Sequence, residues 1–78
     1  MTKVIDVRTI MPPDRHRTVF ETYQGLEPGE SFLLVADHDP VPLHNQFEAN
    51  LAGAYSWDYV QEGPDTWQVE IGRVAAEA

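Results

Sequence analysis

The segment Phe32–Ala36 limits how this chain can fold more than any other, because it is the most apolar run among the 78 residues. An extended chain with this sequence is apolar on both of its faces, which is typical of a central strand. We therefore predict a strand over Ser31–Asp37 in the interior of a sheet. The other elements must be arranged around it.

The pattern on either side of this strand predicts three further strands and two helices. Apolar and polar residues alternate in each of the three strands, and two of them flank a Gly-Pro-Asp turn as a hairpin. Prolines mark the start of both helices, because the first helical turn leaves its N–H groups unbonded in any case. The predicted ranges are strand Lys3–Arg8, helix Asp14–Gln24, a helix from between Pro40 and Pro42 to Gly53, and strands Ala54–Glu62 and Thr66–Gly72.

The element order βαβαββ predicts an α/β fold, more narrowly an α+β two-layer sandwich. Both helices are expected on one face of a four-stranded mixed sheet. A chain of 78 residues has room for one domain, so we expect a single domain over residues 1–78. Its ordered core is predicted from about residue 3 to residue 73, followed by a frayed tail over Val74–Ala78.

Chemically reactive side chains follow the central strand directly. The eight residues Asp37–His44 contain two histidines and two aspartates. Open α/β sheets bind ligands at the carboxyl ends of their strands. If the first two strands are parallel neighbours, both helices begin at this same edge of the sheet. The sequence therefore predicts a site there.

A metal centre is the first hypothesis for this edge, with His16, His38 and His44 as ligands and Asp37 or Asp39 adding an oxygen. Imidazole nitrogens suit transition-metal ions such as zinc, iron, copper and nickel, so the cofactor would be one of these. The alternative is structural, because Asp37 and Asp39 are also suited to capping the second helix and its preceding turn.

Binding of an anion or a small acid is the second hypothesis. Two helix N-termini that meet at one edge offer free backbone N–H groups and partial positive charge. Arg8 and Arg15 would add full charges as ligand-binding residues. The alternative is that the arginines are solvated or form salt bridges with Asp6 and Glu21.

Catalysis has less support, because no nucleophile lies in a recognisable motif, although Asp37 or Asp39 could orient His38 as a base. The four aromatic residues of the hairpin favour a core role, and a partner surface is the alternative. They are Tyr55, Trp57, Tyr59 and Trp67.

The charge balance excludes some partners. Five Lys and Arg residues against thirteen Asp and Glu residues give a net charge of −8. Nucleic acid and anionic membranes are therefore not expected as partners, whereas a basic protein or a cation would suit this charge. The N-terminal residues lack the pattern of a signal peptide, and no apolar run is long enough to span a membrane, so we expect a cytoplasmic protein.

Five segments together carry a resemblance to a known family. They are Ile5–Arg8, Pro12–His16, Leu26–Glu30, Asp37–Leu43 and Gly63–Trp67. In combination they resemble the domain-of-unknown-function family 2249, over nearly the whole chain from about Val4 to Ile71. The same layout is similar to the TusA/SirA-like sulfur-carrier fold.

The resemblance to the sulfur carriers implies their fold but not their activity. Their first helix begins with a Cys-Pro-x-Pro motif, and the corresponding stretch here is Ile10–Pro13, with Met11 at the cysteine position. A thioether cannot form the persulfide of that chemistry. We therefore expect no sulfur transfer.

The sequence as a whole favours a small acidic binding or regulatory module that works with a protein partner. A metal ion held by the histidines is part of this hypothesis. The alternative is an enzyme or carrier that performs redox or acid–base chemistry at Asp37–His44.

Overall fold

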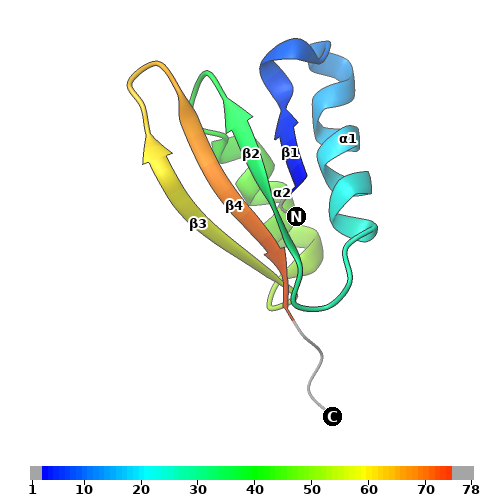
Figure 1. Ribbon diagram of the computed structural model, residues 1–78. Coiled ribbons are helices and arrows are strands. Elements are labelled where there is room, and N and C mark those ends of the chain that lie inside the picture. The colour runs from blue at the N-terminus through cyan, green and yellow to red at the C-terminus, as the bar shows by residue number, and fades with distance from the viewer. Residues whose placement is uncertain (1–2, 75–78) are drawn as a thin grey trace.

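The central strand predicted from the apolar run lies inside the sheet. In the computed structural model, which describes residues 3–74, the sheet order is β1-β2-β4-β3. The elements are β1 Lys3–Asp6, the 3-10 helix η1 Val7–Thr9, α1 Pro12–Gln24, β2 Ser31–Ala36, α2 Val41–Leu51, β3 Tyr55–Glu62 and β4 Trp67–Arg73 (Figure 1). β2 pairs with β1 in parallel and with β4 antiparallel, so strands flank it on both sides.

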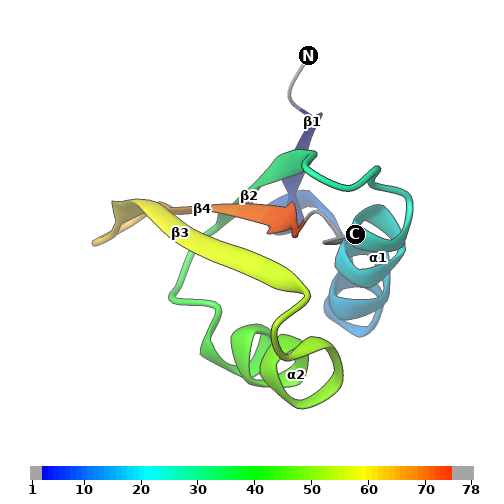
Figure 2. The same cartoon turned by 90° about the horizontal axis from the view of Figure 1, so that it is seen from below.

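The predicted two-layer α+β sandwich and the order βαβαββ are confirmed. The sheet is mixed, and both helices cover the same face of it (Figure 2). The hairpin is also confirmed, since β3 and β4 are antiparallel neighbours. β4 lies between β2 and β3, so the connection through α2 spans one strand. The predicted tail beyond Val74 lies outside the described residues.

The first strand is shorter than its alternating pattern predicts. It ends at Asp6 because the carboxylate of that residue accepts the backbone N–H of Arg8 at 3.0 Å. This bond closes the 3-10 turn η1, which leads the chain away from the sheet toward α1. The first helix begins earlier than predicted, at Pro12, with Met11 as its N-cap residue.

The core fills the space between the sheet and the two helices. Its largest fully buried side chains come from every layer: Phe32, Phe47, Leu34, Ile71, Val19 and Val69. Burying an apolar side chain of this size stabilises the fold by about 1.5–3 kcal/mol. Tyr55, Trp57 and Trp67 are half-buried against this core, which supports the core interpretation for these three, whereas Tyr59 is 37% exposed. No helix within residues 3–74 combines the length and the apolar character that crossing a membrane requires.

The outer strand β3 contains an irregularity in its pairing with β4. The register shifts between Tyr59 and Gln61, so that Gln61 pairs with Gln68 and Glu62 with Trp67. An extra residue of this kind is a β-bulge, which disturbs the ladder and increases the local twist.

The sheet face opposite the helices carries an unfavourable pair. Asp58 on β3 and Glu70 on β4 are direct cross-strand partners, and both are exposed. Glu70 also accepts a hydrogen bond from the hydroxyl of Ser31 at 3.3 Å. Like charges directly opposite each other destabilise a sheet.

The substitution Asp58→Asn is therefore expected to stabilise the fold by about 0.2–1 kcal/mol, because it removes this repulsion. Urea unfolding at neutral pH measures the change. Asp65→Asn in the exposed hairpin turn removes the same charge and serves as the control. An equal gain from both variants would show that net charge, and not the cross-strand pair, is responsible.

Candidate functional site

A cavity lies where the two helices begin, at the carboxyl ends of β1 and β2. Its volume is about 180 Å³. The parallel pairing of β1 and β2 brings both helix starts to this edge, as the sequence predicts. Most of the lining is apolar, with Val19, Leu34 and Leu43 as its buried floor. Arg15, His16 and His38 are the lining residues whose side chains contain nitrogen.

Two of the three histidines predicted as ligands line this cavity, and each ring has one nitrogen held in place. Nδ1 of His38 lies 2.6 Å from Oδ1 of Asp37. Nδ1 of His16 lies 3.1 Å from Oε1 of Gln46 on α2. A carboxylate only accepts, so Nδ1 of His38 carries the proton of this hydrogen bond, and in the neutral ring the acceptor nitrogen is Nε2.

The third histidine, His44, and the second aspartate, Asp39, contact aromatic residues of β3 instead. The ring of His44 stacks on Trp57, with centroids 4.2 Å apart and planes 7° from parallel. Asp39 accepts the hydroxyl of Tyr59 at 2.7 Å. Among residues 3–74, no group of three or more His, Cys, Asp or Glu side chains could hold a metal ion. The metal hypothesis therefore stays a prediction, with His16 and His38 at the cavity.

The structural alternative for the aspartates is wrong in its detail. The N-cap of α2 is Pro40, and no side chain forms a capping hydrogen bond there. Asp39 contributes its backbone oxygen instead, which accepts the N–H of Val41 at 2.8 Å. Asp37 and Asp39 use their carboxylates for His38 and Tyr59, as described above.

The expectation of free backbone N–H groups at the helix starts is also corrected. Pro12 and Pro13 occupy the first two positions of α1 and have no N–H, and the N–H of Asp14 donates to Met11 at 2.8 Å. In α2, Pro42 lacks the N–H and that of Val41 is already bonded. The prolines that begin the helices therefore remove most of the donors that an oxyanion would use there.

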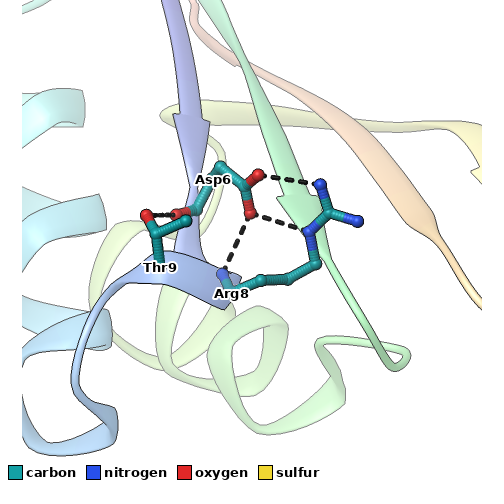
Figure 3. Close-up of polar contacts among 3 residues, drawn as sticks. All are labelled: Asp6, Arg8 and Thr9. Atoms are coloured by element: carbon teal, nitrogen blue, oxygen red, sulfur yellow. Dashed lines mark hydrogen bonds and ion pairs between the residues drawn. The ribbon is translucent and has the colours of Figure 1, made fainter.

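The two arginines predicted as ligand-binding residues differ in their environment. Arg15 is half-buried at the cavity, and its Nε donates to the carbonyl oxygen of Ile10 at 2.9 Å. Arg8 binds both carboxylate oxygens of Asp6, at 2.9 Å and 2.8 Å (Figure 3). The salt-bridge alternative thus describes Arg8, and also Arg17, whose Nε lies 3.9 Å from the carboxylate of Glu21. Arg17 forms a shorter ion pair, at 2.8 Å, with Asp14, which the alternative did not name.

Two carboxylates near this edge of the sheet, outside the cavity lining, have lowered pKa values. The hydrogen bond from His38 lowers the pKa of Asp37, and the nearby charge of Arg15 acts in the same direction. The hydrogen bond from Arg8 lowers the pKa of Asp6. Both carboxylates are therefore ionised at neutral pH.

One contact at the site was not found from the sequence. Gln46, which positions His16, belongs to a different helix, and nothing in the local pattern marks it. Met11, the N-cap residue of α1, is 70% exposed and is not a lining residue of the cavity.

The ion pair of Asp6 and Arg8 predicts a defined pH dependence. A carboxyl group whose pKa is lower in the folded chain stabilises the fold above its unfolded pKa, and this stabilisation is lost as the pH falls through the folded pKa. Arg8→Gln keeps the backbone bond to Asp6 but removes the guanidinium. We expect the pKa of Asp6 to rise toward the ordinary value of an aspartate, because the hydrogen bond and charge of Arg8 that lower it are lost.

A ¹³C NMR titration of the Asp6 carboxyl group measures this pKa directly. Arg17→Gln, which removes an exposed arginine of α1, is the control and should leave Asp6 unchanged. An Asp6 pKa that is the same with and without Arg8 would contradict the assignment.

Comparison with known proteins places the chain in a family. No curated protein and no solved structure matches the chain. The model of one family, described as uncharacterized conserved protein (DUF2249), matches residues 4–73. This match covers every strand and helix of the sandwich except Lys3, the first residue of β1. The chain belongs to the DUF2249 family.

Proposed function

We propose that this protein is a binding module that holds a small molecule in the cavity between the N-terminal ends of α1 and α2. The observation that carries the proposal is the cavity itself. It has an apolar floor, and Arg15, His16 and His38 are among its lining residues. A concave, mostly apolar site with a few polar groups is the usual form of a small-molecule site.

The dimensions of the cavity support a small ligand. An apolar cavity of about 150 Å³ is large enough for benzene. The cavity here has about 180 Å³. A second hollow, between the bodies of the two helices, is larger at about 360 Å³ but more open. The cavity at the helix starts is the less open of the two, and therefore has the better shape for a small ligand.

Benzyl alcohol, a neutral probe of suitable size, tests this proposal. We expect it to shift the amide NMR signals of Val19, Ala36 and Leu43, which line the cavity. Ala36→Leu should abolish these shifts, because the larger side chain fills the cavity from its floor. Circular dichroism checks that the variant is folded.

Ala52→Leu is the matched control, since it makes the same change at an exposed residue after α2. It should leave the shifts unchanged. Signals that move mainly around Gln24 and Asn50, which line the open hollow, would refute the assignment of the site. So would an Ala36→Leu variant that is folded and still binds.

Acid–base chemistry is a second candidate function, favoured by the 2.6 Å contact between Asp37 and His38. A carboxylate that holds the Nδ1 proton leaves Nε2 available as a base, which is how acid–base sites orient histidine. His38 is a lining residue of the cavity, so a substrate bound there would meet this ring.

Hydrolysis of p-nitrophenyl acetate reports on such a base. His38→Gln is expected to lower the protein-dependent rate by about 10²–10⁴-fold, the usual contribution of a positioned base. His44→Gln, which removes a ring stacked on Trp57, is the control for loss of an imidazole elsewhere. Equal rates in the wild type and His38→Gln would exclude His38 as a base in this reaction.

A transition-metal ion and a protein partner are not needed for either function, and both stay predictions. Zinc sites in proteins generally use three or four protein ligands, whereas His16 and His38 provide two. A basic partner would be complementary to the exposed pair Asp58 and Glu70 on the open face of the sheet.

A further inference from the structure

We infer that the ligand of the cavity is a small organic monocarboxylate, with an apolar body about the size of a benzene ring and one carboxylate bound by Arg15. This inference rests on the proposed function and adds the chemical class of the ligand. It follows from the state of Arg15, from the blocked helix starts and from the apolar floor.

Arg15 is the arginine available for a ligand. Within residues 3–74 it is the one Lys or Arg that lines the cavity, and it forms no ion pair there, whereas Arg8 and Arg17 are paired with aspartates. Its Nε is fixed by the carbonyl oxygen of Ile10, which orients the guanidinium and leaves the two terminal amino groups. Such a group binds a carboxylate with two parallel hydrogen bonds.

The helix starts argue against phosphate as the ligand. Phosphate sites at helix N-termini depend on free backbone N–H groups. Pro12, Pro13 and Pro42 have none, and the N–H groups of Asp14 and Val41 are already bonded. Among the first three residues of the two helices, this leaves the N–H of Leu43, which is fewer donors than a phosphate site at a helix start uses. A single guanidinium in a chain of net charge −8 suits one negative charge better than two.

The floor of the cavity determines the body of the ligand. Val19, Leu34 and Leu43 offer no hydrogen-bonding side-chain atoms, so a purely polar ion would lose its water shell without compensation. An apolar body gains free energy in the same place, because its surface is removed from water.

Asp37 is the carboxylate that opposes anion binding. Its charge acts on Arg15, but its side chain is 56% exposed and already accepts the Nδ1 proton of His38. Water and salt screen an exposed charge of this kind. Asp37 is not a lining residue of the cavity, so a ligand carboxylate bound to Arg15 inside the cavity would not contact the carboxylate of Asp37.

The test compares benzoate with benzyl alcohol and inorganic phosphate, using amide NMR titrations of the whole chain. Benzoate is expected to bind more tightly than benzyl alcohol, with shifts at Val19, Ala36 and Leu43. Arg15→Gln should lower the affinity for benzoate at least about tenfold, which corresponds to the loss of one charge-assisted hydrogen bond. The affinity for benzyl alcohol should be unchanged.

Two variants make the result independent of folding defects. Arg15→Lys keeps the charge but loses the planar fork, so benzoate should bind more weakly than to the wild type and more tightly than to Arg15→Gln. Arg17→Gln removes the neighbouring arginine outside the cavity and should change benzoate affinity by less than about twofold.

The outcomes separate this inference from the proposed function. If benzyl alcohol binds as tightly as benzoate, or if folded Arg15→Lys and Arg15→Gln bind benzoate like the wild type, the carboxylate class is wrong and the cavity remains a binding site. Displacement of benzoate by equal concentrations of phosphate also overturns the class. If neither benzoate nor benzyl alcohol shifts the cavity amides, both the inference and the proposed function fail.

Discussion

The parallel pairing of β1 with β2 is the interaction on which the rest of the structure depends. It aligns Ile5 with Leu34 and Asp6 with Val35, so both strands end at the same edge of the sheet. Each strand is followed by a helix, and both helices must return across the same face to bury their apolar sides. The cavity forms because two helix starts meet over the ends of two strands.

The prolines at these helix starts shape the chemistry of the site as well as the fold. A proline fixes its own φ near the helical value and so helps to define where a helix begins. It also removes the donor that makes many helix starts anion sites. In the function proposed above, recognition at this edge would therefore depend on side chains, chiefly those of Arg15, His16 and His38. Ligand selectivity at such a site should be easier to change by substitution than the selectivity of a site built from backbone groups.

Much of the fold could be predicted from the sequence, because the determining patterns are local. The apolar run of β2, the alternation of β3 and β4 and the prolines before both helices each mark an element. The position of β4 between β2 and β3 is not a local property, and no pattern within the hairpin specifies it. The early end of β1 depends on one hydrogen bond, in which the carboxylate of Asp6 accepts the backbone N–H of Arg8.

The cavity lies at the edge of the sheet that the sequence indicated, but it is lined by only some of the residues predicted there. His16 and His38 follow the helix and strand boundaries, so their placement could be inferred from the order of elements. His44 lies one turn into α2, where it contacts Trp57 of a strand that comes later in the chain. Gln46 is likewise a partner across 30 residues. Contacts of this range depend on packing between elements, which periodicity does not describe.

The bulge in β3 has a consequence for how this protein behaves at high concentration. An outer strand of eight residues offers a long row of unpaired backbone groups to other molecules. The register shift between Tyr59 and Gln61 interrupts the regular spacing of that row. A second chain that extended the sheet in register at one end of β3 would be out of step at the other. The irregularity thus protects a small, disulfide-free protein against strand-by-strand aggregation.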